Sequence, residues 1–181
     1  MRNTVLFVLG GLMLAGIIHI VTVLMVPYFA TNDAWAEMRR FGRAETFHVL
    51  PLAEAGAEPL AGLDPRMLQA VCRFTLENGP VRITASLPAD FWSIAIFDRR
   101  GRNAYSINDR AADGEELDLV VITPVQMAQL RQDPPEALEN AIVIELPIGE
   151  GLALLRVFVA DETLLPHARA ALETADCAGT L

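Results

Sequence analysis

Residues 70–107 read AVCRFTLENGPVRITASLPADFWSIAIFDRRGRNAYSI, and this stretch determines the fold class. It holds three apolar runs rich in β-branched and aromatic residues, over 70–76, 81–87 and 91–97. Asn78-Gly79-Pro80 follows the first run, and the sequence DRRGR follows the third. Apolar runs separated by short glycine-containing turns are typical of β-hairpins. We therefore predict two hairpins, one joining the first two runs and one joining the third run to residues 103–107.

The rest of the chain supplies further strands and a few helices. The other predicted strands lie at residues 46–52, 117–122, 141–146 and 152–159, the last two pairing across residues 147–151. The predicted helical segments lie at residues 64–65, 123–132, 135–140 and 163–174, and residues 53–62 suit a loop. Hairpins dominate, and strands do not alternate with helices. The expected fold class is α+β, a mainly antiparallel sheet or sandwich with two or three packed helices.

The N-terminus carries a strongly apolar run. Residues 5–26 (VLFVLGGLMLAGIIHIVTVLMV) contain no Asp, Glu, Arg or Lys, and as a helix they would span the ~30 Å core of a bilayer. A cleaved signal peptide is the alternative, with Ala34-Trp35-Ala36 resembling a cleavage tripeptide. The run is longer than a signal core of about 7–15 residues, so we favour a retained anchor. Pro27 is expected to end this helix.

We expect three parts: a transmembrane anchor over residues 1–30, a juxtamembrane helix over 31–45 and an extracytoplasmic α+β domain over 46–181. Counting arginines alone would place the wrong side in the cytoplasm, because Arg39, Arg40 and Arg43 follow the anchor. An apolar run that begins at residue 5 nevertheless resembles a secretory signal. The predicted location is the bacterial inner membrane, single-pass, with the domain on the periplasmic side.

One face of the anchor has small and polar residues. Gly11, Ala15, His19 and Thr22 recur at spacings of three and four, so they share a stripe on a helix. Small residues let two helices approach closely, and a polar side chain in lipid favours a partner. The stripe predicts a helix–helix contact. The alternative is a neutral histidine tolerated within the membrane.

Cys72 and Cys177 are the only cysteines. An even count in a translocated domain favours a disulfide between them, and two unrelated thiols are the alternative. Their separation excludes a CxxC redox motif, and two cysteines without nearby histidine do not form a zinc site. We expect no metal and no cofactor.

The charge balance argues against nucleic acid as a partner. The net charge is −9, from 23 acidic residues and 14 basic residues that are all arginine. An acidic domain is repelled by phosphate backbones. The expected partners are the lipid bilayer and another membrane or envelope protein, while any small-molecule ligand stays unspecified.

A group of charged and polar residues around the second predicted hairpin is the best candidate site. It comprises Asp98, Arg99, Arg100, Arg102, Asn103, Tyr105, Asn108, Asp109 and Arg110. Arginine forks bind carboxylate or phosphate groups, so the cluster predicts a site for an anionic ligand or an acidic partner. The alternative is a solvated turn in which aspartate and arginine pair locally. Trp92 is expected in the core.

Residues 76–83 (LENGPVRI) followed by residues 91–103 (FWSIAIFDRRGRN) resemble the domain-of-unknown-function family twelve-fifty-four. In that family a glycine-proline turn leads into a strand, an aromatic-Ser strand follows, and then Asp and a Gly-Asn turn. The resemblance covers about residues 66–177 and is to the short, membrane-anchored bacterial branch. It implies a mainly antiparallel β fold, and it implies no activity and no catalytic residues. Larger relatives carry a second domain that this sequence lacks.

No motif of enzyme chemistry is present: there is no HExxH, no GxSxG and no phosphate-binding glycine loop. We therefore expect a non-catalytic interaction or assembly module. Two alternatives stay open, a binding domain for a small anionic ligand, and an enzyme whose site combines Asp98 and Asp109 with His48 or His167.

Overall fold

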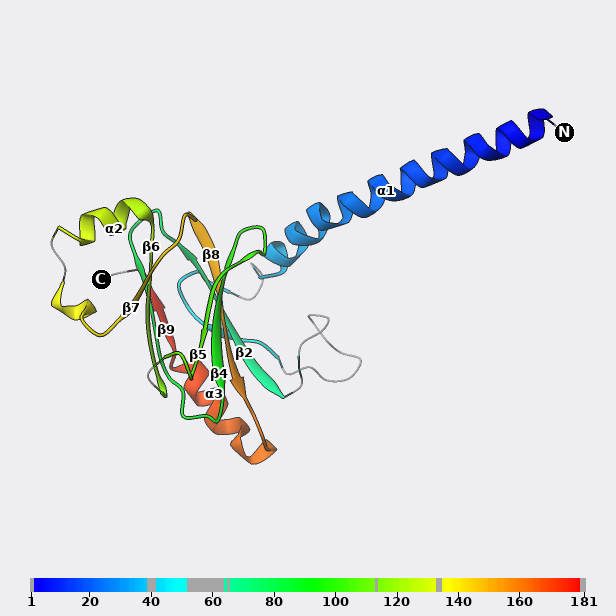
Figure 1. Ribbon diagram of the computed structural model, residues 1–181. Coiled ribbons are helices and arrows are strands. Elements are labelled where there is room, and N and C mark those ends of the chain that lie inside the picture. Colours follow the sequence, from blue (N-terminus) through cyan, green and yellow to red (C-terminus); the bar gives the residue numbers. More distant parts are fainter. Residues whose placement is uncertain are drawn as a thin grey trace.

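A computed structural model of the chain describes residues 2–38, 42–51, 64, 66–112, 114–132 and 135–179. A long helix, α1, projects from a β-sandwich (Figure 1). In the described part of the chain, nine strands form two sheets, and short helices lie at the sandwich's edges. The α+β fold class with two mostly antiparallel sheets is confirmed.

Helix α1 spans Arg2–Met38 without a break. The prediction that Pro27 ends the helix and that a separate juxtamembrane helix covers residues 31–45 was therefore wrong. Proline has no N–H, so the carbonyl of Val23 lacks its usual donor, which weakens the helix by about 3 kcal/mol. The hydrogen bonds of the turns on either side still allow it to continue.

The first sheet has five strands in the order β1-β2-β8-β4-β5, and every pair in it is antiparallel. Its strands are β1 (His48–Val49), β2 (Met67–Thr75), β4 (Trp92–Asp98), β5 (Asn103–Asn108) and β8 (Glu150–Phe158). The predicted hairpin of β4 and β5 is confirmed, with Ile94 opposite Ile107. Strand β1 is shorter than predicted, and the predicted loop at residues 53–62 lies outside the described residues.

The second sheet has four strands in the order β7-β6-β3-β9. Its strands are β3 (Val81–Ser86), β6 (Glu116–Ile122), β7 (Ile142–Glu145) and β9 (Asp176–Ala178). Strands β6 and β7 are parallel, with Val120 opposite Val143. Strand β9 was not predicted, and it brings Cys177 beside Ile83.

Two predicted pairings were wrong. Strands β2 and β3 lie in different sheets, so Asn78-Gly79-Pro80 carries the chain across the sandwich and does not close a hairpin. Strands β7 and β8 are likewise in different sheets. Two apolar runs separated by a short turn are the same sequence pattern in a hairpin and in two strands that face each other across a core. Strands β2 and β3 cannot pair with each other, because the edges of both are already used. Strands β1 and β8 pair with β2, and strands β6 and β9 pair with β3.

One hydrophobic core lies between the sheets. Ala153, Leu155 and Val157 of β8 are buried there, while the residues between them are partly exposed. Trp92 is fully buried, and its Nε1 donates a hydrogen bond to the carbonyl of Gly114 at 3.0 Å. The core prediction for Trp92 is confirmed.

The helices begin near their predicted positions. Helix α2 (Pro124–Leu130) has Thr123 as its N-cap, in a capping box with Gln126. A 3₁₀ turn, η2 (Glu136–Leu138), follows it. A second turn, η3 (Glu162–Leu164), leads into α3 (Leu165–Glu173), whose Ala168 and Leu172 pack into the core. At residues 64–65 only Asp64 is described. It accepts the N–H of Arg66 at 2.9 Å, just before β2.

Candidate functional site

The turn between β4 and β5, residues 98–102, is organised by one buried carboxylate. We call it the arginine turn. Asp98 is 8% exposed, and its Oδ1 accepts the backbone N–H groups of Arg100 at 2.8 Å and Arg102 at 3.0 Å. Its Oδ2 accepts Nε of Arg102 at 2.7 Å. Gly101 has φ +72°, a conformation that favours glycine.

These contacts set the electrostatics of Asp98. Burial alone would raise the pKa of Asp98, but hydrogen bonds from the backbone and guanidinium of Arg102 and from the backbone of Arg100 hold that pKa below its usual range. The Asp98 carboxylate is therefore charged at neutral pH. Asp98 and Arg102 hold the turn together, as the local-pairing alternative expected.

The remaining arginines of the turn face solvent. Arg99 lies 3.4 Å from the Glu150 carboxylate, and both side chains are well exposed, so the pair adds little stability. Arg100 is exposed. A hollow of about 360 Å³ lies beside the turn, lined by residues of three loops including Glu77, Arg99, Arg100, Pro147 and Glu150. Its walls carry both signs of charge, so it is no purely basic patch.

The structure divides the predicted cluster into two groups. Asn103 is the first residue of β5, lies beside the arginine turn and is exposed. Asn108 ends that strand, about 17 Å further along at ~3.4 Å per residue. Asp109 and the exposed Arg110 follow it. Arg110 therefore does not join Arg99, Arg100 and Arg102 at one site.

The residues proposed for an assembled enzyme site are also apart. Asp98 ends β4, and His48 is on edge strand β1, which two strands separate from β4. Neighbouring strands lie ~4.8 Å apart, so His48 is about 14 Å from the strand of Asp98. His167 is on α3, where it lines a small cavity with Asp90. Among the described residues, no group of three His, Cys, Asp or Glu could hold a metal ion.

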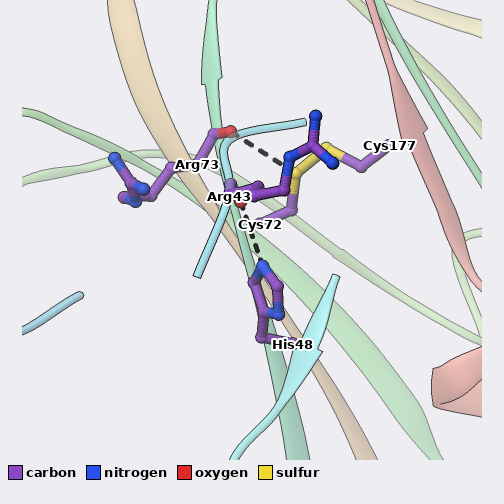
Figure 2. The surroundings of a disulfide bond; sticks show 5 residues. All are labelled: Arg43, His48, Cys72, Arg73 and Cys177. Atoms are coloured by element: carbon purple, nitrogen blue, oxygen red, sulfur yellow. Dashed lines mark hydrogen bonds between the residues drawn. A yellow bond between two sulfur atoms is a disulfide. The ribbon is translucent and has the colours of Figure 1, made fainter. Parts of the chain in front are cut away.

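Cys72 and Cys177 form the predicted disulfide, with Cα atoms 6.6 Å apart. Cys72 is on β2 and Cys177 on β9, so the bond joins the two sheets through the core (Figure 2). The segment after α1 lies against the same region. His48 Nε2 makes a hydrogen bond with the carbonyl of Arg43 at 3.0 Å (Figure 2), and Arg73 donates to the carbonyl of Gly42 at 2.7 Å.

The predicted anchor residues lie on a bare helix. Asn3–Val26 is long and apolar enough to cross a membrane, and none of it is buried against the rest of the chain. Gly11, Ala15, His19 and Thr22 are exposed on it. Thr22 Oγ1 donates to the carbonyl of Ile18 at 2.8 Å, so its hydroxyl is already satisfied within the helix.

One set of residues was missed by sequence reasoning. Gln69, Ser93 and Arg156 interrupt the apolar strands β2, β4 and β8, and the structure brings them side by side on the outer face of the five-stranded sheet. Polar residues inside otherwise apolar strands were the available signal. That signal does not predict which strands pair, so it could not show that the three residues are neighbours.

The family described as "Protein of unknown function (DUF1254)" matches residues 44–178. The chain belongs to this family. The resemblance predicted from residues 76–103 is thus confirmed at the level of the DUF1254 domain, and the matched region begins in the segment that joins α1 to the sandwich. No protein of curated function matches the chain.

Two solved structures are similar to this DUF1254 chain. The VPA0106 protein from Vibrio parahaemolyticus aligns with a TM-score of 0.57 at 9% identity, over 82% of this chain and 35% of that one. An uncharacterized protein from Burkholderia cenocepacia aligns with a TM-score of 0.42 at 16% identity, over 62% of this chain and 32% of that one. The first likeness shows the fold alone. The chain spans about a third of the length of each solved protein.

The N-terminal apolar helix has the length and composition of a membrane anchor or of a signal sequence. Disulfides persist in oxidising compartments. The apolar helix and the Cys72–Cys177 bond together indicate an extracytoplasmic DUF1254 domain.

Proposed function

We propose that this DUF1254 protein is a retained, single-pass protein of the bacterial inner membrane. Its sandwich would lie on the periplasmic side and act as a non-catalytic interaction or assembly module. The observation that carries the proposal is a fully exposed apolar helix joined to a disulfide-bonded sandwich. An apolar surface of this size is unfavourable in water, so lipid or another protein is expected to cover the helix.

Two features support retention over cleavage. The apolar stretch Asn3–Val26 has 24 residues and covers about 36 Å at 1.5 Å per residue, more than the core of a signal peptide requires. The tripeptide at residues 34–36 lies within α1. Proteolysis concentrates in exposed loops, so a site inside a helix is a poor substrate.

Two surfaces are proposed for partner contact. The first is the stripe of Gly11, Ala15 and His19 on α1, where small side chains leave room for a second helix. The second is the pair Arg99 and Arg100, which project from the arginine turn into solvent and fit an acidic surface on a partner. Arg102 is excluded from the second surface because it is held by Asp98.

The test is mild crosslinking of the tagged full-length protein in its native membranes, followed by mass spectrometry. We expect an intact protein of 19.7 kDa and a specific crosslinked partner. The double variant Gly11→Leu/His19→Leu should lose a partner that binds in the membrane. Gly10→Leu is the matched control, because Gly10 lies on the opposite side of α1.

The same experiment tests the arginine turn. Arg99→Ser/Arg100→Ser should lose a partner that binds the sandwich, whereas Arg110→Ser removes an exposed arginine from the far end of β5 and should have no effect. A shortened mature protein would refute retention. If the wild-type protein remained a monomer and crosslinked to no other protein, the assembly role would be refuted.

A further inference from the structure

A row of polar residues crosses the outer face of the five-stranded sheet. Arg156 on β8 lies opposite both Gln69 on β2 and Ser93 on β4, and Ser93 lies opposite Asn108 on β5. The neighbours of these residues along each strand point into the core, so these four side chains point away from it. We call the four residues the polar row.

Two residues of the polar row are buried although they lie on an outer face, while Arg156 and Asn108 are partly exposed. Gln69 is 6% exposed and Ser93 is 7% exposed. Ser93 Oγ and Arg156 Nε are buried and have no hydrogen-bond partner. A buried donor without a partner is costly, and the few that native proteins keep need an explanation.

An open surface cavity of about 600 Å³ lies over the part of the row on β4, β5 and β8. Its walls combine Ser93, Asn108 and Arg156 of the row with other residues of this sheet face, namely Met67, Phe91, Ser106, Ile107 and Ala111. Both residues with unpartnered donors are thus in its walls. Such a mixture of apolar surface and a few convergent polar groups is typical of small-molecule sites.

Arg156 supplies the charge of this cavity. Arg82, Arg99 and Arg102 each form an ion pair, with Asp118, Glu150 and Asp98 respectively. Arg156 has no ion pair with any carboxylate in the described ranges. Asn108 adds donors, because its Oδ1 already accepts the N–H of Ala111 at 3.2 Å and its amide NH₂ remains to donate.

We propose that the cavity over the polar row binds a small monocarboxylate with an apolar chain or ring. The guanidinium of Arg156 matches a carboxylate with two parallel N–H donors. The hydroxyl of Ser93 and the amide of Asn108 donate to the same group, and Met67 and Phe91 contact the hydrocarbon part. One arginine balances one negative charge, so a monoanion fits better than a dianion.

The test is calorimetric titration of the full-length protein in a non-ionic detergent, with benzoate and hexanoate as probes. We expect 1:1 binding with Kd of roughly 0.01–1 mM, and at least ~10-fold weaker binding of neutral benzamide and of inorganic phosphate. Arg156→Met should weaken benzoate binding at least ~10-fold, as loss of a charged hydrogen-bonding group does. Ser93→Ala should weaken it about 5-fold.

Arg131→Met is the matched control, because Arg131 is an exposed arginine that follows α2 beside the other sheet, outside the cavity walls, and its loss should leave benzoate binding unchanged. Should Arg156→Met fail to fold, Arg156→Lys keeps the charge, removes the fork, and should still weaken binding several-fold. Equal binding of benzamide and benzoate would overturn the proposal. So would unaltered binding by the folded Arg156 variant, or no binding of either acid at about 10 mM.

Discussion

Asp98 shows how a single residue can organise a turn that sequence reasoning assigned to binding. Its two oxygens accept the backbone N–H groups of Arg100 and Arg102 and the side chain of Arg102. It is the acceptor at the centre of the arginine turn, so its own role is structural. The arginines left for partners are Arg99 and Arg100.

The Asp98→Asn variant should lose about 2 kcal/mol of unfolding free energy at pH 7, because hydrogen bonds to a charged acceptor are stronger than neutral ones. The pKa of Asp98 is lowered in the folded protein. Its stabilising effect is therefore complete above the unfolded pKa of about 3.9 and is lost as pH falls through the lower folded pKa. Urea unfolding at pH 7 and at about pH 2–3 measures both effects.

The exposed Asp90→Asn variant is the matched control for Asp98 and should change the unfolding free energy by less than about 0.5 kcal/mol. If Asp98→Asn destabilised the protein equally at both pH values, the ionised carboxylate would not be the source of the effect.

At the scale of elements, strand β2 connects the parts of the molecule. It pairs with β1 and β8 in its own sheet, is joined to β9 of the other sheet by the disulfide, and holds the segment after α1 through Arg73. Gly42 in that segment has φ +132°, and the ring of His48 lies where a side chain would be. Strand β2 therefore holds the segment that begins at Gly42.

Cys72→Ala/Cys177→Ala should lower the unfolding free energy by about 3–5 kcal/mol, because the bond closes a loop of 105 residues. Guanidinium unfolding under oxidising conditions measures the change. The wild-type protein with a reductant should fall to the same midpoint as the variant. Equal midpoints for the oxidised wild type and the variant would show that packing alone joins the sheets.

At the scale of the whole molecule, α1 and the sandwich are held together by the chain and share little packing. Residues 3–26 bury nothing against the sandwich, which has its own core (Figure 1). Residues 3–26 and the sandwich are therefore separate structural units.

Removal of residues 1–38 should leave the sandwich folded once the Cys72–Cys177 bond has been formed under oxidising conditions, with an unfolding free energy within about 1 kcal/mol of the full chain, because no core residue is lost. The truncated protein should also be extracted from membranes without detergent. Thermal unfolding and membrane fractionation measure the two effects. A large loss of stability would mean that the helix packs on the sandwich.

The sequence by itself determined the local features of this protein. Strand positions followed from apolar runs, the start of α2 from Thr123 and Pro124, and the disulfide from the only two cysteines. The apolar N-terminal helix and the DUF1254 resemblance were equally readable, because each depends on residues close together in the chain.

Only the tertiary structure decided which strands are neighbours. The apolar runs of β2 and β3 fit a hairpin and fit two facing sheets, and pairing with strands distant in the sequence determines the second arrangement. The same long-range pairing brought Arg156 beside Ser93. A strand's own residues specify its faces, while its partners depend on how the whole core packs, which no local pattern encodes.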